Sequence, residues 1–372
     1  MNVWRSPVSG AALAADTPWS LDDGRGERWP VVDGIPYLRI GREALVADTL
    51  RLLDAGEADA ATALLLADQD DWWTGPAADP ADLARLVRER DTLTLREAMA
   101  LLRLGPVADY FAHRWVDPTY LAGLALIEAH WQAPARAFEL ACGIGHYLRA
   151  LTGRGVACMG GDVVFAKCWL ARHWVAPAAD YVVFDAGGHW PLADDRFDLA
   201  MCHDAFYFLP EQAHVAACLR VTLAEGGVLA ISHLHNADYR DGAKGPARSA
   251  TAWRALFPDA VVYDERALLA AILHPRAPAA IGWRDDPAIE AWSLVEGGGA
   301  ARVPENGVAM PPADAMLRPN PLLDAPGGVR WPSDRWRDEY GAGCRWALAD
   351  EALPYPPDPV RLRRLVDLPA RW

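Results

Sequence analysis

Positive charge is scarce in this 372-residue sequence, which has 36 lysine and arginine residues against 50 aspartate and glutamate residues. Only two of the 36 are lysines, Lys167 and Lys244, and the net charge is −14 at pH 7. Nucleic-acid-binding proteins usually present a basic patch that releases counterions from the phosphate backbone, so this balance argues against a nucleic-acid partner. We expect a small-molecule or modest peptide substrate instead.

Paired cysteines and long apolar runs are also absent. The six cysteines stand singly, with no C-x-x-C pair, which argues against a disulfide framework and a zinc site, and we predict no metal. No apolar run reaches the roughly 20 residues that a membrane-spanning helix needs, so we expect no membrane association. Residues 1–9 lack the charged-then-apolar order of a secretion signal, and we therefore expect a cytoplasmic protein.

The chain is longer than the roughly 250–300 residues at which a single core stops growing, so we expect a central domain with appended segments. In residues 1–41, Pro, Gly and Asp clusters separate short apolar runs, as in a small β-rich module. Apolar residues recur at spacings of three and four through residues 42–131, which predicts a lid of amphipathic helices. Residues 298–372 are rich in proline and tryptophan, and we expect this extension to pack against the core.

Residues 132–297 carry the pattern of an α/β domain. Apolar strand-like runs alternate there with helical ones, which predicts a doubly wound parallel sheet of the Rossmann-like kind. The expected strands span residues 135–141, 156–162, 180–186, 197–203, 227–235, 260–264 and 289–297. Doubly wound sheets bind nucleotide-like ligands at the carboxyl ends of their strands, so candidate site residues should follow these runs.

A glycine-containing turn follows the first expected strand, in the phrase E-L-A-C-G-I-G-H at residues 139–146, and a helical run comes directly after it. Glycine lets a ligand approach the backbone where a Cβ would block it. A dinucleotide-binding dehydrogenase would need G-x-G-x-x-G, yet Leu148 stands where the third glycine belongs. Acidic residues end the next two strands: Asp162 suits the hydroxyls of a ribose, and Asp185 suits an adenine amino group.

In the order of these segments, residues 135–236 resemble the class I S-adenosylmethionine-dependent methyltransferase family. The resemblance implies S-adenosyl-L-methionine as the cofactor, with its methionine part at the glycine turn, its ribose at Asp162 and its adenine at Asp185. Ala141 departs from the pattern by replacing the first glycine, which is tolerable if its backbone dihedrals are ordinary, and His146 stands where a glycine or small polar residue is common. The implied cofactor-binding residues are Glu139, Ala141, Gly143, Gly145, Asp162, Val163, Asp185, Ala186 and His203.

The N-terminal segment resembles the zinc-ribbon (Trm112-like) module that precedes some methyltransferase domains, because it ends in the phrase PVVDGIPYL at residues 30–38. Such a module opens with a C-P-x-C-G knuckle, where this chain has Ser6-Pro7-Val8-Ser9-Gly10. Serine is a poor zinc ligand compared with a thiolate. We expect a module that keeps its shape without zinc, and an ordinary β-rich extension is the alternative.

Methyl transfer from a sulfonium requires the acceptor to be held at about 3–3.5 Å, and it requires a base only where the acceptor must lose a proton. His203 is the first candidate for that base, because the ordinary pKa of histidine, about 6.5, suits neutral pH. His233 and Tyr207 are further catalytic candidates. We expect His233 and His235 to point to opposite faces of a continuous strand, so that only one of them faces the site. The residues expected on the acceptor side are Tyr110, Arg114, Asp204 and His235.

The leading hypothesis is an enzyme that methylates an oxygen or nitrogen of a small metabolite or modest peptide beneath the helical lid. A non-catalytic partner subunit that keeps the fold for stability is the second hypothesis. An RNA methyltransferase is the third, and the acidic balance and missing cysteine pairs count against it. The sequence leaves the identity of the acceptor and the oligomeric state open.

Overall fold

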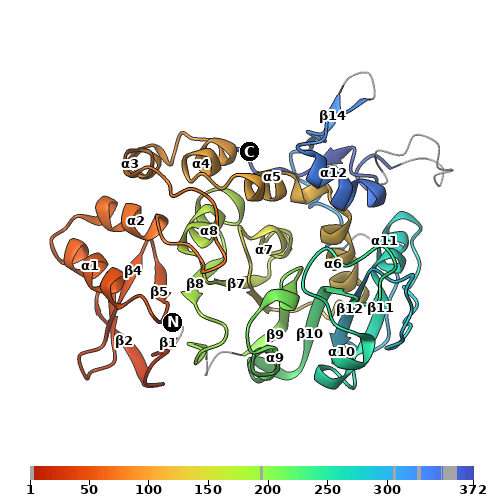
Figure 1. Cartoon of the computed structure of the whole chain (residues 1–372), viewed down its shortest axis with the longest axis horizontal. Coiled ribbons are helices and arrows are strands. Elements are labelled where there is room, and N and C mark those ends of the chain that lie inside the picture. Colours follow the sequence, from red (N-terminus) through yellow and green to blue (C-terminus); the bar gives the residue numbers. More distant parts are fainter. Residues whose placement is uncertain (1–3, 193–195, 305–306, 325–327, 345, 347–357) are drawn as a thin grey trace.

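The computed structural model describes residues 4–192, 196–304, 307–324, 328–344, 346 and 358–372. Its centre is a sheet of twelve strands in the order β1-β2-β3-β4-β5-β8-β7-β6-β9-β10-β12-β11 (Figure 1). The seven strands predicted within residues 132–297 all form: β6 (Arg136–Leu140), β7 (Ala157–Asp162), β8 (Asp180–Phe184), β9 (Phe197–His203), β10 (Leu223–His235), β11 (Val261–Asp264) and β12 (Ala291–Glu296). The prediction of a Rossmann-like α/β domain is confirmed.

Strands β6 to β10 run parallel to one another, and the strand order reverses between β6 and β9. Strand β12 instead lies antiparallel between β10 and β11, so the predicted parallel sheet includes one antiparallel strand near this edge. An apolar run indicates that a strand is buried but not which way it runs, and antiparallel edge strands are common on such sheets. The reversal between β6 and β9 creates the crevice in which doubly wound sheets bind ligands.

The N-terminal segment forms β1 (Trp4–Arg5), β2 (Ala12–Thr17), β3 (Ser20–Asp22), β4 (Arg28–Val32) and β5 (Ile35–Leu38). These strands extend the central sheet, because β5 pairs in parallel with β8. In the turn at residues 6–10, the Ser6 hydroxyl accepts hydrogen bonds from the amides of Val8 at 3.1 Å and Ser9 at 3.0 Å, and it donates to Glu27 at 2.7 Å. Among the described residues, no three His, Cys, Asp or Glu side chains gather as a metal site. The absence of zinc stays a prediction.

The lid region forms α1 (Glu43–Asp54), α2 (Ala58–Leu66), α3 (Pro80–Glu89), α4 (Leu95–Leu101), α5 (Pro106–His113), the 3-10 helix η1 (Arg114–Val116) and α6 (Pro118–Ala129). Asp79 and Asp117 cap α3 and α6 through their carboxylates, and a proline follows each cap. Helices α3, α4 and α5 follow one another along one rim of the molecule (Figure 1). None of the helices in the described ranges is long and apolar enough to cross a membrane.

The core helices are α7 (His146–Thr152), α8 (Phe165–Leu170), η2 (Ala171–Val175), η3 (Phe206–Phe208), α9 (Gln212–Val221), α10 (Ala250–Leu256) and α11 (Glu265–Leu273). The C-terminal extension adds α12 (Asp334–Tyr340), η4 (Gly341–Gly343), β13 (Arg318–Pro319), β14 (Leu323–Asp324), β15 (Gly328–Val329) and β16 (Leu365–Val366). As expected, its described part packs on the rest of the protein: Trp346 and Trp372 donate indole hydrogen bonds to the carbonyls of Val116 at 2.9 Å and Ala112 at 2.8 Å. The boundaries between the four segments stay a prediction.

Candidate functional site

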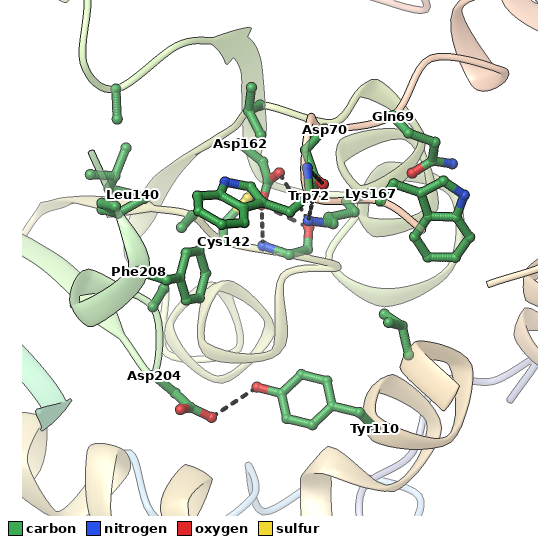
Figure 2. A pocket seen from close by; sticks show the side chains of 18 of the residues that line it. Gln69, Asp70, Trp72, Tyr110, Leu140, Cys142, Asp162, Lys167, Asp204 and Phe208 are labelled. Atoms are coloured by element: carbon green, nitrogen blue, oxygen red, sulfur yellow. Dashed lines mark hydrogen bonds and ion pairs between the residues drawn. The ribbon is translucent and has the colours of Figure 1, made fainter. Parts of the chain in front are cut away.

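A cavity of about 850 Å³ lies at the carboxyl ends of β6 to β9, within the range of roughly 300–1,000 Å³ typical of small-molecule sites. Its wall also includes residues 39–42, residues 69–73, helix α5 and helix α12 (Figure 2). Of 13 buried side-chain nitrogen or oxygen atoms without a hydrogen-bond partner in the described structure, five belong to this wall: Arg39 Nε, Trp73 Nε1, Glu139 Oε2, His203 Nε2 and Trp336 Nε1. Buried polar groups are normally hydrogen-bonded, so this concentration indicates a ligand site.

The turn between β6 and α7 is shaped by glycines with positive φ. Gly143 and Gly145 have φ of 53° and 82°, and a Cβ on Gly143 would come within 3.2 Å of the Phe111 ring. Glu139, just before the turn, is 2% exposed, and its Oε2 atom has no partner. Burial raises the pKa of Glu139 well above its ordinary value, which favours the protonated carboxyl.

Ala141, which replaces the first glycine of the motif, has a φ of 54°. The backbone of Ala141 is therefore not in an ordinary conformation, which was the condition for alanine to replace glycine here without strain. A left-handed conformation costs a residue with a Cβ about 1–2 kcal/mol. Neighbouring hydrogen bonds hold the turn in place, since the Cys142 amide donates to the Gly161 carbonyl at 3.1 Å and the Gly143 amide donates to Asp162 at 3.0 Å.

Replacing Ala141 with glycine should raise the free energy of unfolding by about 0.5–1 kcal/mol, because relief of the left-handed strain outweighs the added entropy of the unfolded chain. Urea denaturation of the full-length protein measures the change. The control Ala150→Gly, inside α7, should instead lower the free energy of unfolding by about 1 kcal/mol. Equal destabilisation by the two substitutions would show that Ala141 is not strained.

Asp162 ends β7 and is 5% exposed. Its Oδ2 accepts a hydrogen bond from the Gly143 amide and its Oδ1 from the Val164 amide, both at 3.0 Å. Two of the roughly four lone-pair positions of the carboxylate remain, enough for the two hydroxyls of a ribose. Lys167 Nζ lies 3.6 Å from Asp162 and 3.7 Å from Asp70 (Figure 2). Asp162 therefore both fixes the glycine turn and lines the cavity.

Asp185 follows β8 and lines the cavity together with Val163 and Ala186. Its Oδ2 accepts a hydrogen bond from the Ile40 amide at 2.9 Å, and its Oδ1 lies 3.6 Å from Arg39 Nε. Burial raises the pKa of Asp185 despite these contacts. The N-terminal segment thus reaches the region in which the adenine is expected.

His203 ends β9 and lines the cavity, with Nδ1 2.9 Å from Ser232 Oγ and Nε2 without a partner. Its ring centroid lies 4.3 Å from that of Tyr147. Burial lowers the pKa of His203 to about 3, and the charge of Arg114 acts in the same direction. The neutral imidazole is a weak base at physiological pH, which counts against the general-base role that its sequence position favours. That role stays a prediction.

Asp204, directly after β9, is the centre of a buried hydrogen-bond network. Tyr110 donates to its Oδ2 at 3.1 Å (Figure 2), and Tyr207 donates to its Oδ1 at 3.2 Å. Arg114 Nη1 donates to Oδ2 at 2.9 Å and also to Asp117 at 3.0 Å. The expected acceptor-side residues Tyr110, Arg114 and Asp204 are thus brought together, and they join the lid to the sheet.

His233 and His235 do not line the cavity within the part of the chain that the structure describes. Their ring centroids are 4.6 Å apart, so the expectation that they face opposite sides of β10 is wrong. Residues two positions apart on a strand point to the same face, so ordinary alternation already contradicts that expectation. A bulge is also present here, because His233 has a φ of 63° and the pairing of β10 with β12 shifts between Ile231 and Leu234.

His233 is the charged member of this histidine pair. Its Nδ1 lies 2.7 Å from Glu265 and its Nε2 lies 3.8 Å from Asp204. Burial alone would lower the pKa of His233, but these carboxylates outweigh burial and raise it to about 10. Burial lowers the pKa of His235 to about 4. Burial would likewise raise the pKa of Asp204, yet the charges of His233 and Arg114 outweigh it, so the pKa of Asp204 is lowered.

Several wall residues lie outside the predicted set. Arg39 comes from the N-terminal segment, Trp72 from the lid region and Trp336 from α12. Lys167 is conspicuous in the sequence as one of two lysines, and Trp336 belongs to a tryptophan-rich phrase. Neither feature indicates which distant segment it will meet, so no sequence signal assigned these residues to the site.

A comparison with protein families identifies the core. Residues 138–231 match a family described as a methyltransferase domain. These residues belong to the class I S-adenosylmethionine-dependent methyltransferases. No curated protein matches the chain significantly.

Solved methyltransferase structures resemble parts of the chain. CalS10, an amino pentose methyltransferase from Micromonospora echinaspora bound to S-adenosylmethionine, is 25% identical with a TM-score of 0.30, over 34% of this chain and 56% of that one. A TehB-like methyltransferase from Corynebacterium glutamicum is 18% identical with a TM-score of 0.38, over 51% and 98%. A complex containing the Haloferax volcanii Trm112 methyltransferase activator gives 18% identity and a TM-score of 0.36, over 53% and 93%. At these TM-scores the likeness says nothing about what the methyltransferase domain of this chain modifies.

Proposed function

We propose that this protein transfers a methyl group from S-adenosyl-L-methionine to a small molecule or modest peptide held between the sheet edge and the lid. The observation that carries the proposal is the cavity beside the glycine turn, whose wall includes residues of the lid region, the core and α12 with buried polar atoms that have no hydrogen-bond partner. The cofactor, when bound, supplies an electrophilic methyl group on a sulfonium. A fold kept only for stability would gain nothing from polar atoms left buried without partners.

The cofactor half of the cavity is assigned to the strand ends. Glu139 and Gly143 would hold the methionine part, because the buried carboxyl and the glycine turn line the same part of the cavity wall. Asp162 would bind the ribose with its two remaining lone-pair positions. Asp185, steadied by the Ile40 amide at 2.9 Å, would face the adenine.

The acceptor half is assigned to the lid side. Asp204 would orient the acceptor, with Tyr110 and Tyr207 fixing the carboxylate from two directions. Burial raises the pKa of Tyr207, so its hydroxyl keeps its proton and acts as a hydrogen-bond donor. Helices α5 and α12 would exclude water from the reacting atoms, and positioning of this kind supplies much of the rate in such transfers.

Cofactor binding should release a proton from Glu139. Burial favours the protonated carboxyl in the free protein, whereas the ammonium group of the methionine part would favour the carboxylate. Affinity should therefore fall as the pH is lowered, because the proton competes with the cofactor. Titration calorimetry with S-adenosyl-L-methionine in two buffers of different ionisation enthalpy measures the released proton.

The matched variant for this measurement is Glu139→Gln, which keeps the shape of the side chain. It should bind more weakly, release no proton and lose the pH dependence. Tight binding by the parent without proton release would remove Glu139 from this role. No detectable binding of either S-adenosyl-L-methionine or S-adenosyl-L-homocysteine would overturn the proposed function.

A further inference from the structure

We propose that the methyl acceptor is a neutral amine on a molecule with a sizeable apolar part, and that Asp204 and the aromatic rings around it stabilise the positive charge that develops on the nitrogen. The inference rests on the proposed function, because it assigns the substrate class of the same cavity. Its support comes from the charge balance around Asp204, the aromatic side chains, the weak base at the site and the exposed apolar side chains on the cavity wall.

The buried cluster around Asp204 has an excess of negative charge. Carboxylates and cations alternate at contact distances of 2.7, 3.8, 2.9 and 3.0 Å in the series Glu265, His233, Asp204, Arg114 and Asp117. Three carboxylates against two cations leave one negative charge when all five groups are ionised. An uncompensated buried charge is costly, so a cation beside Asp204 would be stabilised there.

Aromatic side chains surround this position. Tyr110, Tyr207, Trp336 and Tyr340 all line the cavity. The ring centroid of Tyr340 lies 6.2 Å from that of Tyr110 and 5.1 Å from that of Trp336. The Tyr110 ring already meets a cation, since Arg114 Cζ lies 4.9 Å from its centroid. Aromatic faces attract cations within about 6 Å, which suits a nitrogen that becomes positively charged.

His203, which precedes Asp204 and lines the cavity, is a weak base, and this favours nitrogen over a hydroxyl oxygen. Burial lowers the pKa of His203 to about 3, whereas a hydroxyl acceptor needs a base to take its proton. A neutral amine already presents its lone pair. In the transfer, the nitrogen–carbon bond forms as the carbon–sulfur bond breaks, the electron pair of the broken bond stays on sulfur, and the ammonium product loses its proton to water. Positive charge moves onto nitrogen during this step, and a fixed carboxylate stabilises it there.

Exposed apolar side chains stand among charged ones on the wall of the cavity. Ile40, Trp72 and Phe208 are 37%, 79% and 44% exposed, and all three line the cavity; Figure 2 labels Trp72 and Phe208. They account for three of the eight large hydrophobic side chains exposed to this degree among the described residues. A gathering of exposed apolar side chains at one opening marks a binding surface. We assign it to the apolar part of the acceptor, whose amine would then reach inward to Asp204.

The test compares probes of one shape and different charge. The full-length protein, saturated with S-adenosyl-L-homocysteine, is titrated with the cation (2-phenylethyl)trimethylammonium, the neutral isostere (3,3-dimethylbutyl)benzene and the anion 3-phenylpropionate. We expect the cation to bind about tenfold more tightly than the neutral isostere, as expected for a desolvated cation beside aromatic faces. Asp204→Asn should remove most of this preference and leave the affinity for the neutral isostere unchanged.

Glu225→Gln is the charge-matched control. Glu225 is exposed near the start of β10, at the end of that strand away from Asp204, so this variant should keep the preference for the cation. Tyr340→Leu, which leaves the bonds to Asp204 in place, should weaken binding of the cation alone, and it serves if Asp204→Asn does not fold. Equal affinities, or a preference for the anion, in protein that binds S-adenosyl-L-homocysteine would overturn the amine and leave the methyltransferase proposal standing. Failure to bind S-adenosyl-L-homocysteine would overturn both.

Discussion

Asp162→Asn is expected to lower the affinity for S-adenosyl-L-methionine about 100-fold or more. The substitution removes the charge from a carboxylate that would accept two ribose hydroxyls, and hydrogen bonds to charged groups contribute about 1.5–3 kcal/mol each. It also turns an amide N–H toward either Gly143 or Val164, whose amides donate to the two oxygens at 3.0 Å. The glycine turn should loosen as a result. Titration calorimetry at one pH and salt concentration measures the loss.

Asp180→Asn is the matched control for this variant. Asp180 begins β8 at the far end of the sheet and is exposed, so its charge should not affect cofactor affinity. Thermal unfolding of both variants separates a local effect from a general loss of stability. An Asp162→Asn protein that folds and binds the cofactor as tightly as the parent would remove Asp162 from the ribose site.

The core could be predicted from sequence because its strands are continuous apolar runs that end at turn or polar residues. Residues 157–162, for example, form β7 as expected, and Asp162 faces the cavity because it is the last residue of that strand. The local sequence is enough to predict that a residue lies at the end of a strand. The direction of β12 cannot be predicted in this way, because an apolar run is compatible with either direction.

The acceptor half could not be predicted in the same way. Its wall combines residues 69–73 and α5 with α12, which follows both of them by more than 200 residues along the chain and meets them only through packing. Two local interpretations were also wrong. His233 and His235 are two positions apart and share one face, as strand alternation requires, and burial makes His203 a much weaker base than its ordinary pKa suggests.

Some of the chosen residues nevertheless meet as expected. Tyr110 and Arg114 both contact Asp204, although 94 and 90 positions separate them from it. Their helical segment precedes the first core strand, and a lid that folds back over the sheet edge brings them to the strand ends. The sequence could not show that Tyr110 and Arg114 both donate hydrogen bonds to the carboxylate of Asp204. Because these bonds join the lid to the sheet, the three residues stabilise the fold as well as line the site.

Arg114→Met is expected to lower the free energy of unfolding by about 3–5 kcal/mol, because removing one partner of a buried ion pair leaves an uncompensated charge. Arg114 is 2% exposed and donates through Nη1 to Asp117, Thr119 and Asp204. Methionine fills much of the same space, so the loss reports charge more than an empty volume. Urea denaturation of the cofactor-free protein gives the value.

Two further variants test whether the lost charge causes the destabilisation expected of Arg114→Met. Arg266→Met removes an exposed partner of Asp264, 2.6 Å away, and such a surface pair should cost only about 0–1 kcal/mol. The triple substitution Arg114→Met, Asp117→Asn and Asp204→Asn removes the stranded carboxylates together with the arginine. It should recover much of the lost stability, since replacing a whole buried ion cluster by uncharged groups is often neutral. If the triple variant is less stable than Arg114→Met alone, hydrogen bonds to the carboxylates hold the lid, and the guanidinium charge does not.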